Sequence, residues 1–430
     1  MESTALSFTV EFHYLHKGVK SYFRRIAFSE AAVEWTDSDS GRIPILSWCR
    51  NVEKTAMDQA VNLSRHSQMF HHVAIMSDCH PGYGMPIGGV IACAKAIIPY
   101  AVGVDIGCGI VAVRTDTSAA GISKADLRGI VEKAGRYIPT GEGHSHRSTQ
   151  KWEHWGRLPG WLDKRGRELA VRSLGTLGGG NHFIEVQEGD DGFIWLMVHS
   201  GSRNIGYRIA NHHHKVALKH CRNHREVLPA QDLSFLPVES NEGRAYIRDM
   251  IFALDYALEN RKRLMESFRE IYAGVITDAR FCDQVNIHHN YAALENHFGR
   301  DVWVHRKGAT SAMKGQEGIV PGSMGTHSYI VQGLGNPDSF CSCSHGAGRV
   351  MGRREASRKL VLARCDASMK DVVFSGWKKY SGFGKRKKGA PLLDLSEAPD
   401  AYKDIEEVMK AQLDLVKPLV RLKPLGVVKG

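Results

Sequence analysis

The chain has 430 residues, 43% of them hydrophobic, and 57 Lys and Arg against 46 Asp and Glu give it a formal net charge of +11. It has no run of about 18 apolar residues and no basic segment followed by an apolar one at its start, so we expect neither a membrane-spanning helix nor a secretory signal. Nine scattered cysteines then indicate reduced thiols in a cytoplasmic protein, and the positive charge favours a polyanion such as nucleic acid over simple solubility.

Apolar and polar residues are patterned for both strands and helices. Residues 1–42 alternate in places, which predicts a short strand pair or an appended segment. Residues 47–65 are predicted to form an amphipathic helix. We predict buried strands at 71–78, 88–98, 109–115 and 193–199, and an exposed loop at 140–160.

The longest predicted helix covers residues 243–272, where apolar side chains recur at helical spacing. A basic, glycine-broken loop follows at 376–391, and residues 396–416 are predicted to form another helix with acids in its first turns. Strands and helices do not alternate regularly, and there is neither a P-loop nor a strand–GxGxxG–helix unit. The fold class is therefore predicted to be mixed α/β (α+β), and any phosphate chemistry needs another route.

Five segments place side chains that could bind a metal in or beside glycine-rich or polar turns. They are VGVDIGCGI with Asp105 and Cys108, GTLGGGNHFIEV with His182, MVHSGSRNIG with His199, NIHHNYAALE with His289, and FCSCSHGAGR with His345. Carboxylate, thiolate and imidazole together suit Mn, Fe, Co or Zn better than Mg or Ca. No CxxC pair is present, so a catalytic metal centre is favoured over a closed zinc site, and a thiolate can bridge two metals.

Each of these residues also has a purely structural interpretation. A histidine at a strand end is commonly a hydrogen-bonded structural residue, and a single cysteine is commonly a small buried hydrophobe. We interpret Cys341 and Cys343 as structural, and His80 as supporting or structural. The runs His212–His214 and His71–His72 are predicted to lie on solvated faces.

Taken in order, ten segments resemble the RtcB family of RNA ligases. They are HHVAIMSDCHPGYGMPIGGVIA, AVGVDIGCGI, GTLGGGNHFIEV, VHSGSRNIG, HHNYAALENHFG, VHRKGATSA, GIVPGSMGTHSYIV, SHGAGR, AYKDIEEV and VVKG. The resemblance covers residues 43–430 and implies an RtcB-like catalytic domain with a deep central cleft that holds two metal ions. Residues 1–42 have no counterpart in it and form an N-terminal extension of unknown role.

The resemblance also implies the chemistry. The family uses GTP and two Mn(II) ions per chain to join RNA 3′-phosphate or 2′,3′-cyclic phosphate ends to 5′-hydroxyl ends, in tRNA splicing or RNA repair. Asp105, Cys108, His182, His199 and His289 fall on its metal ligands, and His345 on the nucleophile that forms a guanylyl-histidine. RNA is then the partner, an activating protein is a further candidate partner, and no membrane is involved.

The resemblance also implies a guanosine site, which has more residues than the metal site. It comprises Asn181, His182, Phe183, Ile184, Glu185, His289, Asn290, Pro321, Gly322, Ser323, Met324, Ser328, His345, Gly346, Ala347, Gly348, Tyr402 and Lys429. The RNA-phosphate candidates are Arg203, Arg349, Arg353 and Arg354, and the KRKK run at 385–388 either follows the RNA backbone or is a solvated loop. Two alternatives stay open: a paralogue that caps or processes ends without joining them, and an inactive RNA-binding scaffold.

Overall fold

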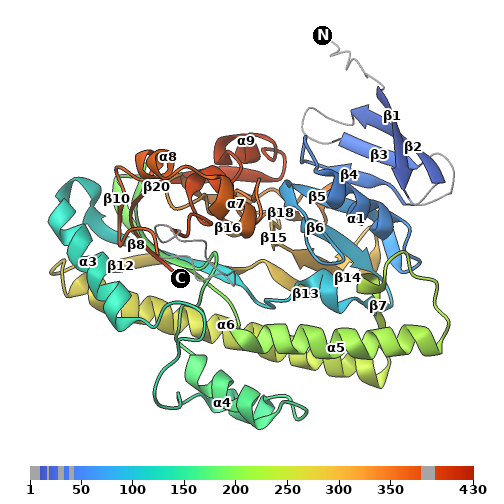
Figure 1. The fold of residues 1–430 in the computed structure, drawn as a ribbon, viewed down its shortest axis with the longest axis horizontal. Coiled ribbons are helices and arrows are strands. Elements are labelled where there is room, and N and C mark those ends of the chain that lie inside the picture. The colour runs from blue at the N-terminus through green and yellow to red at the C-terminus, as the bar shows by residue number, and fades with distance from the viewer. Residues whose placement is uncertain (1–9, 17–18, 28–32, 38–42, 379–392) are drawn as a thin grey trace, which may run out of the picture.

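Two curved sheets, flanked by helices, make up the structure (Figure 1). The computed structural model describes residues 10–16, 19–27, 33–37, 43–378 and 393–430. The first sheet has the order β1-β2-β3-β4-β5-β6-β14-β13, and the second has the order β12-β8-β10-β9-β20-β17-β16, with β19 beside β20. β12 and β16, at the two ends of the second order, also contact each other, so this sheet curls almost into a barrel. The predicted mixed α/β class is confirmed.

The bounds of the elements in the described residues are as follows. The strands are β1 Val10–His16, β2 Val19–Ala27, β3 Val33–Asp37, β4 Ile45–Ser47, β5 Met69–His80, β6 Ile87–Cys93, β7 Ala96–Ile97, β8 Gly109–Ser118, β9 Phe183–Gly189, β10 Phe193–Ser200, β11 Leu236–Pro237, β12 Phe281–His288, β13 Asn290–His297, β14 Arg300–Lys307, β15 Ala309–Ser311, β16 Glu317–Val320, β17 Ser328–Gly333, β18 Ser342–Ser344, β19 Val373–Phe374 and β20 Val416–Lys429. The α-helices are α1 Lys54–Ser64, α2 Pro99–Val102, α3 Lys124–Tyr137, α4 Lys164–Ser173, α5 Asn204–Asn223, α6 Asn241–Ala273, α7 Arg353–Lys359, α8 Leu362–Ser368 and α9 Ile405–Lys410. Among these described helices, none combines the length and the apolar character that crossing a bilayer requires.

The N-terminal strands continue the first sheet. β3 pairs antiparallel with β4, and β4 pairs in parallel with β5, a central strand of that sheet. A strand pair was predicted in residues 1–42, but three strands are present there. They are joined to the rest of the first sheet through β4.

Most of the predicted buried strands and the longest helix are confirmed. β5, β8 and β10 contain the predicted strands, α6 contains the predicted helix, and residues 88–98 divide into β6 and β7. Residues 47–65 were predicted as one helix, but only α1 is helical there. The Trp48 amide donates to Ile75 O at 2.8 Å, which keeps the segment before α1 extended along β5.

The predicted helix at 396–416 is also mostly wrong. α9 is short because Asp404 caps its start by accepting from the Glu406 amide, while Pro399 opens a separate 3₁₀ turn and β20 already begins at Val416. The predicted loop at 376–391 lies largely outside the described residues, and the KRKK run at 385–388 lies entirely outside them.

Several histidines predicted to be solvated are buried instead. These are His72, His213 and His214. The reason for the last two is that α5 is covered on both sides: His213 Nε2 lies 2.8 Å from Asp249 Oδ2 on α6, and the ring of His214 stacks on Tyr100 of α2 at 3.7 Å. Sequence spacing alone did not reveal that α5 has two packed faces.

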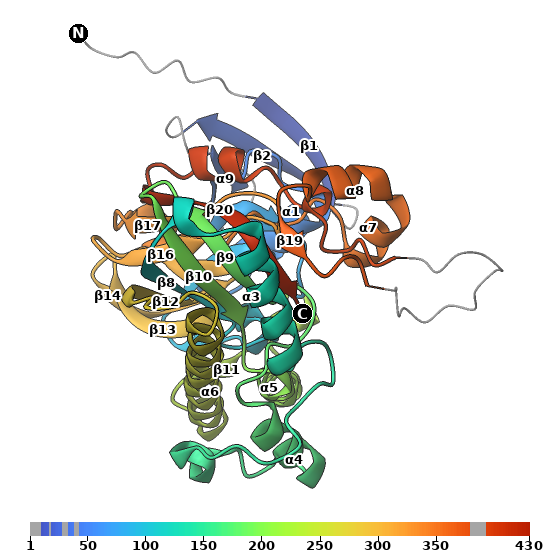
Figure 2. The same cartoon turned by 90° about the vertical axis from the view of Figure 1, so that its left-hand side faces the viewer.

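Helix α6 supports the second sheet from behind, and with α5 it lies below the strands in Figure 2. Its buried Asn260 connects three parts of the chain. The side-chain oxygen accepts from the amides of Gly175 and Thr176 at 2.7 and 3.2 Å, and the side-chain amide donates to Thr176 O, Ser200 Oγ and Gly201 O. This one side chain therefore fixes the end of β10 and the turn after α4, which both lead into the site described below.

We predict that Asn260→Ala lowers the free energy of unfolding by about 2–4 kcal/mol, because it leaves several buried polar groups without partners. The measurement is urea denaturation followed by circular dichroism. The control is Asn296→Ala, whose amide makes an exposed contact with Asp301 in the β13–β14 hairpin and should change stability by less than about 0.5 kcal/mol. Equal effects of the two substitutions would contradict the assigned role of Asn260.

Candidate active site and metal centre

Four neighbouring strands bring the predicted metal ligands to one edge of the second sheet. In the order β12, β8, β10 and β9, the residues that stand opposite one another are Ile287, Ile110, His199 and Phe183. Cys108 immediately precedes β8, His182 immediately precedes β9, and His289 immediately follows β12. Antiparallel pairing thus places residues that are far apart in the chain at the same level of the sheet.

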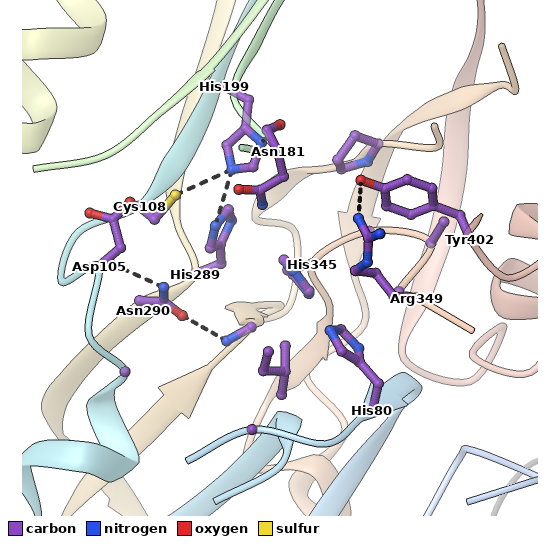
Figure 3. Close-up of a pocket in the computed structure, with 18 of the residues that line it drawn as sticks. His80, Asp105, Cys108, Asn181, His199, His289, Asn290, His345, Arg349 and Tyr402 are labelled. Carbon is purple, nitrogen blue, oxygen red and sulfur yellow. Dashed lines mark hydrogen bonds between the residues drawn. The ribbon is translucent and has the colours of Figure 1, made fainter. Parts of the chain in front are cut away.

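The donor atoms of the five predicted ligands form one continuous cluster. Cys108 Sγ lies 3.4 Å from His182 Nε2 and 3.3 Å from His199 Nε2. His199 Nε2 is 3.4 Å from His289 Nε2, and His182 Nε2 is 3.3 Å from Asp105 Oδ2. Figure 3 shows Cys108, His199 and His289 converging in this way. The donor atoms of Cys108, His182 and His199 all lie within 4.8 Å of one another, a spacing that fits a shared metal ion.

The imidazoles are held in the form that binds metals. His182 Nδ1 donates to Leu177 O at 3.0 Å and His199 Nδ1 donates to Asn181 O at 3.2 Å, which leaves each Nε2 lone pair facing the cluster. Burial lowers the pKa of His182, and lowers the pKa values of His199 and His289 well below the usual range. All three rings are therefore neutral at physiological pH.

Asp105 is fixed in a tight turn beside these rings. The amide and hydroxyl of Ser202 both donate to its Oδ1 at 3.2 Å. Burial opposes ionisation, but the neighbouring His182 ring and the charge of Arg203 outweigh it and lower the pKa of Asp105. A Cβ on Gly201 would lie 2.4 Å from Asp105 Oδ2, so only glycine leaves room for the carboxylate.

His345 lies next to the cluster and has its own carboxylate partner. Its ring centroid is 4.8 Å from that of His289. Its Nδ1 is 2.6 Å from Oδ2 of Asp78, which is fully buried at the end of β5. Because a carboxylate accepts from Nδ1–H, the other nitrogen, Nε2, is available to a reactant. Gly348, at φ 72°, allows this approach, since a Cβ there would lie 2.1 Å from Asp78 O.

A cavity of about 360 Å³ contains His345 and one side of the cluster. In Figure 3, His345 lies between Cys108 and His289 on one side and Arg349 and Tyr402 on the other. The predicted site residues that line it are Asp105, Cys108, Asn181, Phe183, His199, His289, Asn290, Pro321, Gly322, Ser323, Met324, His345, Gly346, Ala347, Gly348, Arg349, Arg353, Tyr402 and Lys429. The predicted residues outside its lining are His182, Ile184, Glu185, Ser328, Arg203 and Arg354.

Comparisons with known proteins show the family of this chain. A family model described as tRNA-splicing ligase RtcB matches residues 59–156 and 154–430. This chain belongs to the RtcB family of RNA ligases. It is 38% identical to the RNA-splicing ligase RtcB of Escherichia coli strain K12 over 90% of this chain and 97% of that protein. It is 30% identical to the RNA-splicing ligase RtcB of Mycobacterium bovis over 86% of this chain and 100% of that protein, and 29% identical to the tRNA-splicing ligase RtcB of Thermococcus kodakarensis over 87% and 91%.

In this RtcB-family site, one carboxylate holds three cations. Glu397 Oε1 accepts from Arg349 at 3.1 Å and from Arg353 at 2.9 Å, and its Oε2 lies 3.3 Å from Lys429 Nζ. Burial opposes ionisation of Glu397, but Lys429, Arg353 and Arg349 lower its pKa to about 2. Tyr402 also donates to it. The two arginines predicted to contact RNA phosphates at the cavity are thus already positioned by Glu397.

The other two arginine candidates lie elsewhere. Arg203 is largely enclosed behind the cluster, with Nε 3.2 Å from Thr176 Oγ1. Arg354 is exposed at the start of α7. Neither lines the cavity.

Glu185 is buried behind the cavity wall. Its Oε2 accepts from Gln187 Nε2 at 2.7 Å, and Gln187 also donates to Ser328 at 3.2 Å. Burial raises the pKa of Glu185 to about 7, against the opposing effects of Lys429 and Gln187. This carboxyl group is therefore poised between its neutral and ionised forms near physiological pH.

Three residues of the site were missed by sequence reasoning: Asp78, Lys307 and Glu397. Asp78 is a fully buried carboxylate near the end of β5, and an acid that follows a buried apolar run could have been marked as functional. Lys307 lies inside one of the segments that carry the family resemblance, but nothing in the sequence indicated that its side chain is buried. Glu397 was interpreted as an acid in the first turn of a helix, and nothing in the sequence indicated otherwise.

We predict that Cys108→Ser lowers metal uptake by at least one equivalent relative to the unsubstituted chain, because it removes the central donor of the cluster. The measurement is elemental analysis after equilibration with Mn(II) and dialysis. Cys282→Ser is the matched control, since Cys282 is an exposed thiol on β12. An unchanged metal content in Cys108→Ser would refute the assignment.

We predict that Glu185 makes the metal- and nucleotide-free protein less stable as pH rises from about 4.5 to about 7. In that window the folded protein keeps a proton that the unfolded chain has released, because the folded pKa is about 7. Across this pH window, the free energy of unfolding of the unsubstituted chain should fall by at most about 3 kcal/mol relative to that of Glu185→Gln. The measurement is urea denaturation at several pH values. The exposed Glu317→Gln serves as control, and a pH-independent difference for Glu185→Gln would contradict the prediction.

Proposed function

We propose that this chain is a GTP-dependent RNA ligase that joins 3′-phosphate or 2′,3′-cyclic phosphate ends to 5′-hydroxyl ends in tRNA splicing or RNA repair. The observation that carries the proposal is the pair Asp78–His345 beside the five-donor cluster, with His345 and four of the five donor residues lining one cavity. Family membership and the RNA-ligase names of the relatives support the substrate class.

His345 is the proposed nucleophile. Its Nε2 attacks the α-phosphorus of GTP while the bond to pyrophosphate breaks, which leaves a guanylyl group on the ring. Asp78 holds Nδ1–H throughout, so that the ring keeps its orientation and the developing positive charge is stabilised. An oxygen of the RNA 3′-phosphate then displaces His345 from that phosphorus. Finally, the 5′-hydroxyl attacks the activated 3′-phosphorus and GMP leaves. A cyclic end must first be hydrolysed to the 3′-phosphate.

The cluster has the donors that this proposal needs. Asp105, Cys108, His182, His199 and His289 would hold the metal, which we propose to be two Mn(II) ions per chain. Bound there, divalent cations neutralise phosphate charge and polarise the phosphorus under attack. The mixed thiolate, imidazole and carboxylate set fits Mn(II), and neutral imidazoles are ready to bind it.

The guanosine site is proposed on the wall that carries Phe183, Met324, Tyr402 and Lys429, all of which line the cavity. We propose that Glu185 selects guanine when ionised, because a carboxylate accepts from both N1–H and the 2-amino group; the base must reach past the lining residues to contact it. Adenine has an acceptor at N1 and would be rejected.

The proposed catalytic unit is residues 43–430, since every proposed site residue lies there, and residues 1–42 are treated as an N-terminal extension. Within the described residues all nine cysteines are free thiols, which supports our proposal of a cytoplasmic enzyme. An activating protein remains a candidate partner and RNA is the proposed substrate.

The decisive experiment incubates the protein with Mn(II) and GTP labelled in the α-phosphate and measures acid-labile label on the protein. We expect His345→Ala to abolish the label while metal content is preserved, because the nucleophile is lost and the five donors remain. His224→Ala is the matched control, since His224 is exposed at the end of α5. Persistent label on His345→Ala would place the nucleophile elsewhere, and loss of metal along with label would make His345 structural.

Product length separates the alternatives. With a 3′-phosphate RNA and a 5′-hydroxyl RNA, a joined product on a denaturing gel supports ligation. A capped 3′ end without joining identifies an end-processing enzyme, and RNA binding without any labelling of His345 identifies an inactive scaffold.

A further inference from the structure

Part of the cavity wall is not used by the site as proposed. It is formed by Pro81, Gly82 and Tyr83, in the loop between β5 and β6, together with Lys307 from the end of β14. Tyr83 lines the cavity and yet is 68% exposed. An exposed aromatic ring at the mouth of a reactive cavity can stack on a planar ligand that enters it.

The backbone of this loop is held firmly while the Tyr83 ring is left free. Lys307 Nζ donates to the carbonyl oxygens of Tyr83 and Met85, the latter at 3.0 Å, and the Met85 amide donates to Tyr83 O at 2.8 Å. The Gly82 amide donates to Gln59 Oε1 at 3.1 Å. The ring is therefore presented from a fixed position, so binding against it costs little ordering of the loop.

Hydrogen bonds connect two further tyrosines to the backbone of the Tyr83 loop. Lys307 Nζ also donates to Tyr100 O at 3.2 Å, so the same ammonium group ties the loop to α2. The Tyr100 hydroxyl donates to Asn211 Oδ1 at 2.8 Å, and Asn211 Nδ2 donates to the carbonyl of Tyr207, which is 53% exposed on α5. Burial is the main cause that raises the pKa of Tyr100, and Asp232, Tyr207 and Tyr83 raise it further. We call Tyr83, Tyr100 and Tyr207 the tyrosine patch.

The chemistry of the patch points to nucleobases. Stacking on aromatic rings is how proteins hold unpaired bases without reading their sequence, and every base offers such a face. Tyr83 lines the cavity of His345, so a strand whose end reaches that residue passes Tyr83. The net charge of +11 favours the phosphates of such a strand. A protein partner would have no comparable reason to extend into the cavity.

We propose that the exposed ring of Tyr83 stacks on the unpaired base nearest the end of the RNA strand that enters the cavity. This inference rests on the proposed function, because it takes RNA as the substrate. It assigns to Tyr83 a positioning role in which the ring, not the hydroxyl, makes the contact.

The test measures binding of short single-stranded RNA to the full chain, without GTP, at one fixed salt concentration. The terminal base is 2-aminopurine, whose fluorescence is quenched by stacking, placed at a 3′-phosphate end in one arm and at a 5′-hydroxyl end in the other. In the arm that uses the patch, we expect Tyr83→Ala to abolish the quenching and to raise Kd about tenfold, the effect of one base–aromatic stack. Tyr83→Phe should retain both. Tyr137→Ala is the control, since Tyr137 is 65% exposed on α3 and does not line the cavity.

A matched pair of RNAs isolates the stacking contact. When the terminal nucleotide is abasic, the unsubstituted chain should lose the same tenfold in affinity and Tyr83→Ala should cause no further loss. The proposal is overturned if Tyr83→Ala weakens intact and abasic RNA equally, if Tyr83→Phe is as weak as Tyr83→Ala, or if neither arm responds. The binding test is separate from the guanylylation assay described above. If His345 is guanylylated but Tyr83→Ala has no effect on binding, only the role of Tyr83 is refuted. If Tyr83→Ala has a base-dependent effect but His345 is not guanylylated, the ligase proposal is refuted.

Discussion

The hydrogen-bonded register of β12, β8, β10 and β9 is the constraint on which the site depends. A shift of one residue between two of these strands would turn His199 or its neighbours to the opposite face of the sheet. The register is secured on both sides of the sheet by apolar packing, with Val111 and Val198 on one side and Ile110 and Met197 on the other. A slip would therefore disrupt apolar packing on both faces of the sheet. The same packing fixes the positions of the donor atoms in the cluster.

Burying a carboxylate, a thiol and three imidazoles together opposes folding, because each loses hydration. The structure limits this cost by leaving the imidazoles neutral and giving Asp105 several donors. It also supplies carbonyl partners for His182 and His199 from the turns that precede β9. The donors are thus positioned before any cation is bound, so binding need not reorganise them.

The sequence predicted what local patterns control. Alternation and helical spacing located β5, β8, β10 and α6, since these elements bury continuous apolar faces. Family resemblance then identified the residues that the strand register brings together. Apart from the 396–416 helix, whose local breaks were missed, the main failures are tertiary: the burial of His213 depends on Asp249 across two helices, and the partnership of Asp78 with His345 joins residues 267 positions apart. Glu397 shows the same limit, because its three cations come from distant segments.

The two walls of the cavity solve different binding problems. On one wall, Arg349, Arg353 and Lys429 share the single carboxylate of Glu397, so their three positive charges less one negative charge leave a net charge of +2. That excess attracts phosphates, while the shared carboxylate keeps the cations fixed when no substrate is present. On the other wall, Lys307 Nζ donates its hydrogen bonds to backbone carbonyls and is not available to a ligand. The exposed group there is the ring of Tyr83. A wall that attracts phosphate and a wall that offers an aromatic surface together suit a ligand that is both charged and planar, and a strand of nucleotides has both properties at every residue.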